Sequence, residues 1–167
     1  FTEQAGYKSI LKLHDGSYLY VCLTDFVVKR STDDFKTWKE IGRILEEDEL
    51  IDDRNRKYRN FHSNTMTEIQ LDDGTWRIFM PVMTNTYNNS QTYSSSGHFT
   101  EVYYSDDGGA TWNKAANDSR DVTINYVEGD QKLEWGESKI IKCSDGSLRM
   151  YLTRAKYGCM QYTVSYD

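Results

Sequence analysis

The sequence predicts an all-β fold of repeated four-stranded antiparallel sheets, because one pattern occurs three times along its 167 residues. Each copy begins with a run in which apolar and polar residues alternate, turns at Asp-Gly, and continues through a second alternating run. A Ser-x-Asp motif follows at the end of a third run. Alternation with period two around Asp-Gly is the strongest short-range signal for a β-hairpin. The repeat therefore organises the whole chain.

Three matching hairpins open the three copies. They read KSILKLHDGSYLYVCL, MTEIQLDDGTWRIFM and SKIIKCSDGSLRMYL. Their turns, each followed by Ser or Thr, are Asp15-Gly16, Asp73-Gly74 and Asp145-Gly146. These segments predict the first two strands of three similar sheets.

A second motif marks a turn after the third strand of each sheet. It reads STDDFKTW at 31–38, SDDGGATW at 105–112, and SYD at 165–167. The middle copy matches the Asp box, S-x-D-x-G-x-T-W, at every defined position. In such a box the Ser and Asp side chains bond the backbone of a tight turn, and the Gly supplies a conformation closed to other residues. The first copy has Phe35 where Gly is usual, and we expect the motif to mark the fold rather than a catalytic centre.

Composition argues against several classes of function. The net charge is -6 and the pI is near 5.1, with Lys and Arg interspersed among acids, so we expect no nucleic-acid partner. No apolar run approaches the roughly 20 residues that a membrane span requires. The three cysteines, Cys22, Cys143 and Cys159, lack the spacing of a zinc or redox motif. We therefore expect no membrane span, no cofactor and no metal site.

The repeated boxes resemble those of the sialidase (neuraminidase) superfamily, whose Asp-box (BNR) repeats build six-bladed β-propellers from four-stranded blades. The resemblance spans the chain and points to the bacterial type of exo-α-sialidase. It implies a partial propeller over residues 1–167, with blades at about 7–42, 64–115 and 137–167, the last incomplete. Because each blade buries its faces against neighbours, we expect the remaining blades of the same protein to be partners of this chain. A secreted, periplasmic or cell-surface location is implied as well.

Blade topology separates the candidate site residues from the boxes. The Asp-Gly turns and the boxes lie on one rim of a blade, so the start of the first strand and the connection between the second and third strands lie on the other. Charged groups gathered at one mouth of a propeller are the default site hypothesis. The residues selected in this way are Asp25, His62, Trp135, Glu137, Arg154 and Tyr157.

The resemblance assigns roles to three of these residues. Glu137 and Arg154 occupy the positions at which the family has the partner of a tyrosine nucleophile and one arginine of a triad that grips the sialic acid carboxylate. Asp25 falls where the family has its acid/base aspartate. A guanidinium meets a carboxylate through two parallel hydrogen bonds, and a neutral tyrosine avoids the repulsion that an anionic nucleophile would meet. The implied reaction is hydrolysis of terminal sialic acid with retention.

Other interpretations of the same residues stay open. Glu137 and Arg154 could form a structural ion pair, and His62 could be a hydrogen-bonded loop residue. Trp135 and Tyr157 could stack on a sugar or pack between blades. No Arg stands near Lys8, where the family has its first triad member, and we expect the third Arg and the tyrosine beyond residue 167. The alternatives are a non-catalytic propeller that binds glycan or protein, or a glycosidase or lyase for another acidic sugar.

Overall fold

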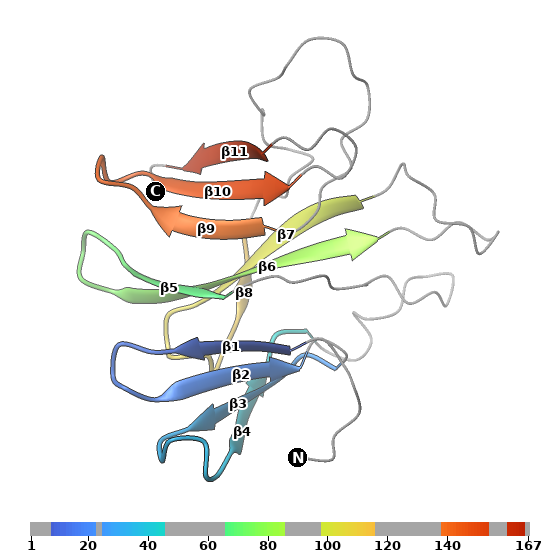
Figure 1. Ribbon diagram of the computed structural model, residues 1–167, viewed down its shortest axis with the longest axis vertical. Coiled ribbons are helices and arrows are strands. Elements are labelled where there is room, and N and C mark those ends of the chain that lie inside the picture. The colour runs from blue at the N-terminus through green and yellow to red at the C-terminus, as the bar shows by residue number, and fades with distance from the viewer. Residues whose placement is uncertain are drawn as a thin grey trace, which may run out of the picture.

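The computed structural model describes residues 8–22, 25–45, 66–85, 98–115, 138–153 and 160–165. Over these residues the chain forms eleven β-strands in three antiparallel sheets and no helix (Figure 1). No described segment is therefore a helix long and apolar enough to cross a membrane. The all-β prediction is confirmed, as are four-stranded antiparallel sheets.

Each sheet is a meander in which consecutive strands pair. The first sheet consists of β1 (Lys8–Lys12), β2 (Tyr18–Cys22), β3 (Val27–Ser31) and β4 (Lys39–Arg43). The second consists of β5 (Thr67–Gln70), β6 (Trp76–Asn85), β7 (His98–Ser105) and β8 (Asn113–Lys114). The third consists, in the described part of the chain, of β9 (Ser138–Lys142), β10 (Leu148–Thr153) and β11 (Met160–Ser165).

The three Asp-Gly turns have the same geometry. In the first, the N–H of Leu13 donates to the carbonyl of Ser17 at 2.8 Å, and the N–H of Gly16 donates to the carbonyl of Leu13 at 3.0 Å. The turns of the other two sheets repeat both bonds at the same distances. The glycine has a positive φ in each turn, 88° at Gly16, which a residue without Cβ adopts at no steric cost. The repeated sequence thus produces a repeated hairpin.

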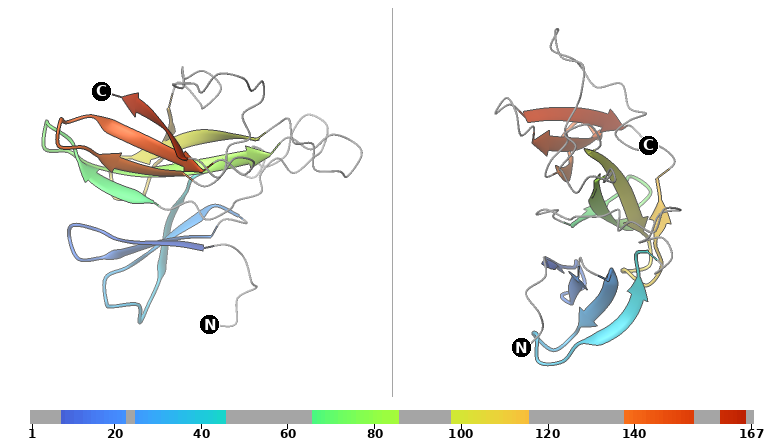
Figure 2. Two further views of the ribbon diagram at one scale, coloured as in Figure 1. Left: turned by 45° about the horizontal axis from the view of Figure 1, so that its top comes forward. Right: turned by 90° about the vertical axis from the view of Figure 1, so that its right-hand side faces the viewer.

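The sheets stack face to face, and alternation along the strands assigns each side chain to one of the two faces of its sheet. The seam between the first and second sheets, the first seam, contains the larger core; the second seam lies between the second and third sheets (Figure 2). Core residues of the first seam include Leu13, Leu19, Val21, Val28, Met66, Ile78, Met80, Val82 and Tyr103. Those of the second seam are Ile69, Phe79, Ile140, Leu148 and Met150. The second sheet is therefore buried on both faces.

Candidate functional site

The stacked sheets have two rims, and the strand order decides which residues lie on each. One rim carries the Asp-Gly turns and the Asp boxes, and we name it the turn rim. The opposite rim carries the beginnings of β1, β5 and β9 and the ends of β2, β6 and β10, and we name it the strand-start rim. In Figure 1 the three hairpin turns lie on the left and the strand-start rim lies on the right.

Asp25 lies on the strand-start rim, in the connection between β2 and β3. Its Oδ1 accepts the N–H of Val27 at 3.0 Å, and its carbonyl accepts a hydrogen bond from Nη1 of Arg43 at 2.9 Å. The following residue, Phe26, is fully buried with a φ of 60°, a strained conformation for an aromatic residue. These two hydrogen bonds hold the connection in place, and the Asp25 side chain stays exposed to solvent. A carboxylate held in this way can serve a bound ligand or simply stabilise the turn.

The other five residues selected from the sequence lie outside the described residues. They are His62, Trp135, Glu137, Arg154 and Tyr157. The described strands nevertheless frame two of these positions, because β9 begins at Ser138 and β10 ends at Thr153. Ser138 pairs with Leu152, so both strand ends belong to the strand-start rim of one sheet. The roles assigned to Glu137 and Arg154 stay predictions.

Two buried hydroxyl groups near the same rim were missed from the sequence. Ser138 is 4% exposed, and neither its Oγ nor Oγ1 of Thr67 has a hydrogen-bond partner. Ser138 shares a face of β9 with Ile140, and Thr67 shares a face of β5 with Ile69, so both project into the second seam. The only sequence signal is a small hydroxyl residue inside an apolar-alternating run.

A buried carboxylate in the first seam was missed as well. Glu101 on β7 is 4% exposed, and its Oε1 accepts a hydrogen bond from Nζ of Lys114 at 2.5 Å. The hydroxyl of Tyr103 lies 3.4 Å from its other oxygen. A buried acid is tolerated when it is paired and hydrogen-bonded in this way. Glu101 therefore joins β7 to β8, and we assign it no catalytic role.

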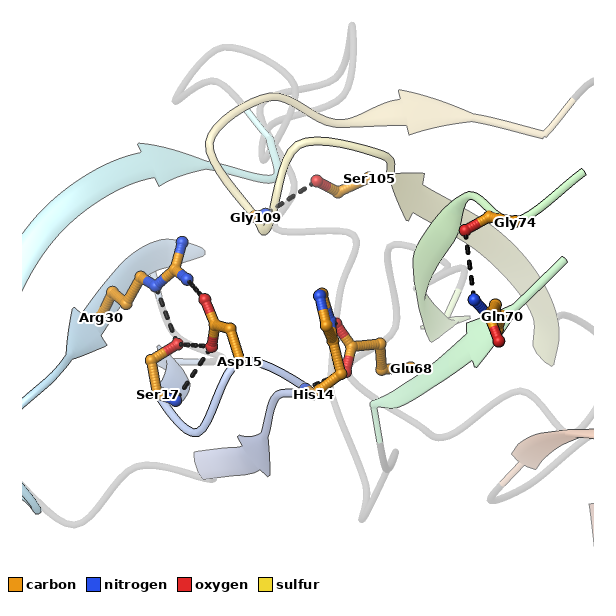
Figure 3. Close-up of polar contacts among 9 residues, drawn as sticks. All are labelled: His14, Asp15, Ser17, Arg30, Glu68, Gln70, Gly74, Ser105 and Gly109. Carbon is orange, nitrogen blue, oxygen red and sulfur yellow. Dashed lines mark hydrogen bonds and ion pairs between the residues drawn. The ribbon is translucent and has the colours of Figure 1, made fainter.

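The turn rim holds many acids, and hydrogen bonds from its own residues engage them. Oδ1 of Asp15 accepts the N–H of Ser17 at 2.9 Å and its hydroxyl at 2.6 Å, while Arg30 bonds both residues (Figure 3). The Ser17 hydroxyl is the main cause that lowers the pKa of Asp15. The third sheet repeats the arrangement with Asp145, Ser147 and Arg149.

The turn rim also joins the first two sheets. Glu68 accepts the backbone N–H of His14 at 2.6 Å and contacts its Nδ1 at 2.8 Å, and the imidazole stacks on Trp76 with ring centroids 4.4 Å apart. Figure 3 shows His14 and Glu68 facing one another across the first seam. Among the described residues no group of three His, Cys, Asp or Glu side chains could hold a metal ion. The geometry of the turn rim is that of a scaffold.

The Asp boxes complete this scaffold. In the second box, Asp107 accepts the hydroxyl of Ser105 at 2.8 Å, the N–H of Thr111 at 2.9 Å and the hydroxyl of Thr111 at 2.6 Å. The N–H of Gly109 donates to Oγ of Ser105 at 2.9 Å (Figure 3). The box lies between β7 and β8. Both carboxylate oxygens of Asp107 are thus engaged within its own turn, which is the arrangement of a structural element.

Comparison with known proteins finds a similar fold in several solved structures. No family model matches the chain, and no curated protein matches it. An α-L-arabinofuranosidase from Fusarium graminearum, solved with an iminosugar inhibitor, superposes with a TM-score of 0.62 at 16% identity, over 96% of this chain and 45% of that one. A protein of unknown function from Dyadobacter fermentans gives 0.60 at 18% identity, over 100% and 50%. A putative exo-β-1,3-galactanase from Bifidobacterium bifidum gives 0.53 at 12% identity, over 96% and 52%.

The likeness at these low identities concerns the fold. The chain shares the β-propeller type of fold with these proteins and spans about half the length of the three structures described. An arabinofuranosidase and a putative galactanase carry the likeness, so the narrower sialidase type and the number of six blades stay predictions.

Proposed function

We propose that the chain belongs to the catalytic propeller of an exo-acting glycoside hydrolase whose site lies on the strand-start rim. The observation that carries the proposal is the stack of three antiparallel sheets, which superposes over 96% of its length on an arabinofuranosidase. The distribution of acids supports the choice of rim. On the turn rim, Asp15, Asp107 and Asp145 each accept at least two hydrogen bonds within their own turns, whereas the Asp25 carboxylate on the strand-start rim accepts one, from the N–H of Val27.

The proposed substrate is a terminal acidic sugar, with sialic acid as the first candidate. Arg154 follows the end of β10, and a guanidinium there pairs with the sugar carboxylate through two parallel hydrogen bonds. Glu137 precedes β9 and serves as base toward a tyrosine nucleophile, which the rest of the protein supplies. Asp25 exchanges the proton of the leaving oxygen. The first two assignments rest on the family resemblance, and that of Asp25 rests also on its exposed position.

Hydrolysis assays on the full-length protein test this proposal. We expect release of sialic acid from sialyl-lactose, a loss of kcat on the order of 100-fold or more in Glu137→Gln, and a smaller loss in Asp25→Asn. Arg154→Lys should raise KM for the acidic substrate because an ammonium cannot reproduce the paired hydrogen bonds. Asp34→Asn is the matched control, since Asp34 is exposed on the turn rim, and it should keep full activity.

The substrate panel separates the fold-level proposal from the narrower one. Aryl arabinofuranosides and a β-1,3-galactan are assayed beside sialyl-lactose. Hydrolysis of a neutral sugar with sialyl-lactose untouched would keep the glycosidase and refute the sialidase assignment. A folded protein inactive on every substrate would refute both.

One observation favours a second candidate, a propeller that binds glycan without hydrolysis. The Oδ1 atom of Asp25 accepts the N–H of Val27, which is the hydrogen bond of an Asx turn, and such a bond gives the carboxylate a structural role without any reaction. Calorimetric titration with sialyl-lactose decides between the two. Binding that leaves the ligand intact after prolonged incubation supports the binder.

A further inference from the structure

The large hydrophobic side chains that are exposed in the described chain lie on two faces only. They are Ile10, Phe35, Ile141 and Tyr162. Ile10 pairs with Tyr20 across β1 and β2, and Phe35 stacks on Tyr18, so both lie on the face of the first sheet that points away from the second. Ile141 and Tyr162 lie on the opposite end of the stack, on the outer face of the third sheet.

The outer face of the first sheet has a counterpart in the second and third sheets. In each of those two sheets, the corresponding face packs against the preceding sheet. Counting from the turn glycine, the position of Ile10 corresponds to that of Ile140, which is 5% exposed because it packs against the second sheet. The position of Tyr18 corresponds to that of Leu148, which is buried in the same seam. The face therefore occurs three times, and it is covered in the two sheets that have a preceding sheet.

The Asp boxes show how this contact is made. The second box packs so closely against the first sheet that a Cβ added to Gly109 would come within 2.9 Å of Cδ1 of Leu19. A Cβ on Gly42 of the first sheet would come within 2.2 Å of the carbonyl oxygen of Ala110. Phe35 takes the position of Gly109 in the first box and is 43% exposed. A surface shaped like that around Leu19 would exclude the Phe35 ring.

The tryptophans of the two boxes also differ, in the hydrogen bonding of their indole N–H groups. Nε1 of Trp112 donates to the carbonyl of Gly109 at 2.9 Å, and the ring packs against the core of the first seam. Nε1 of Trp38 is buried and has no hydrogen-bond partner, while its ring packs on Tyr20 and Phe35. A buried indole N–H ordinarily finds an acceptor. The outer face of the first sheet thus presents an aromatic surface, beneath which the indole N–H of Trp38 lies without an acceptor.

A further blade of the same protein is already expected to cover this face, and we propose that this blade has Gly, Ala or Ser where the first sheet has Leu19. A small residue there leaves a recess for the Phe35 ring. The matched structures support this occupant, since this chain covers only 45% and 50% of two of them.

A second copy of this chain is a poorer occupant. Its third sheet would present Arg149 at the position of Leu19, the third residue after the turn glycine. That guanidinium stacks on Tyr162, 5.5 Å from the ring centroid, and fills the space that Phe35 needs. It would also face Lys12, whose Nζ lies over the Tyr18 ring. Two cations on facing surfaces oppose association.

Thiol labelling of the full-length protein tests the proposal without reference to enzymatic activity. Phe35→Cys and Ile10→Cys place a thiol on the face at two separate points, so a folding defect in one variant leaves the other informative. Thr32→Cys is the control, because Thr32 is exposed on the turn rim with the second sheet already in place. Mass spectrometry follows each site, so the native cysteines do not interfere.

We expect the thiols at 35 and 10 to react on the order of 100-fold more slowly than the thiol at 32, at every protein concentration. All three should react equally in urea. Equal rates in the native protein would overturn the proposal, because the face would then be open. Protection that disappears on dilution would overturn it in favour of a second copy. A large residue at the Leu19 position of the covering blade would refute the proposed recess.

Discussion

The two complete Asp boxes of this chain form the same turn with different residues at its tip. Ser31, Asp33 and Thr37 make the same hydrogen bonds as their counterparts in the second box, including the 2.6 Å bond from the threonine hydroxyl to the aspartate. The second box has two glycines at its tip, with φ of 72° and 95°. The first has Asp34 and Phe35, with φ of 53° and 67°.

The comparison separates two reasons for a glycine. Phe35 shows that the turn itself forms with a positive φ at an ordinary residue, at a cost of about 1–2 kcal/mol. Gly109 is required for another reason, because Leu19 of the neighbouring sheet occupies the place of a side chain. The glycine of the box is therefore set by the contact between sheets as much as by the turn.

Alanine substitutions at two glycines test this distinction and should have the largest effect. Gly74 and Gly109 have similar φ, 89° and 95°, but a Cβ at Gly74 meets nothing within 4 Å. Gly74→Ala should therefore cost only the backbone strain, about 1–2 kcal/mol. Gly109→Ala should cost about 1–3 kcal/mol more, because the fully buried Leu19 must shift. Urea unfolding measures both, and equal losses would contradict the contact argument.

The box aspartates should show an intermediate effect with a defined pH dependence. The Thr37 hydroxyl, and then its N–H, lower the pKa of Asp33 to about 2 from 3.8. Burial alone would raise the pKa of Asp107, but hydrogen bonds, first from the Thr111 hydroxyl, outweigh it and lower that pKa. A depressed carboxyl pKa stabilises the fold above the unfolded value and loses this effect as pH falls through the folded value. Wild-type stability should therefore fall between about pH 4 and pH 2.

Asparagine variants isolate that contribution. Asp107→Asn should lower the free energy of unfolding at pH 7 by about 1–3 kcal/mol, and the loss should exceed that of Asp33→Asn. The reason is that Asp107 accepts one further hydrogen bond, from the N–H of Ala110 at 3.0 Å. Both variants should show a shallower decline below pH 4 in thermal melts. A decline as steep as that of the wild type would show that other carboxyls dominate acid unfolding.

The smallest effect is expected at the tip of the first box. Asp34 is exposed and has a positive φ, so Asp34→Gly should stabilise the chain by roughly 0.5–1 kcal/mol through relief of backbone strain. The melting temperature of the variant measures this gain. A loss of stability would mean that the Asp34 carboxylate makes an interaction that outweighs the strain.

Local chemistry explains which parts of the fold could be predicted from the sequence. The three Asp-Gly turns and the box at 105–112 depend on residues within one turn, and the structure forms them as the repeat indicated. The first box lacks its glycine, yet its hydrogen bonds survive because Ser31, Asp33 and Thr37 make them. Local patterns were therefore sufficient for the strands and turns.

The features that escaped prediction depend on contacts between sheets. Glu101 stands in an alternating run, and only the strand register reveals that it points into the first seam beside Lys114. The buried hydroxyls of Thr67 and Ser138 are hidden for the same reason. Of the six predicted site residues, Asp25 is the one within the described residues. The assays above test the roles of Asp25, Glu137 and Arg154.

The contact between His14 and Glu68 also has a consequence for folding during synthesis, because its two residues are made at different times. The two residues are separated by 54 positions in the chain. At a translation rate of roughly 5–20 residues per second, the ribosome reaches Glu68 on the order of 3–10 s after it has added His14. In the later part of that interval, after β4 has been synthesised, the first sheet has all its strands but not its covering sheet, so its apolar residues Leu19 and Val21 lack the second sheet that buries them. The nascent protein therefore passes through a stage at which chaperones have a defined surface to bind.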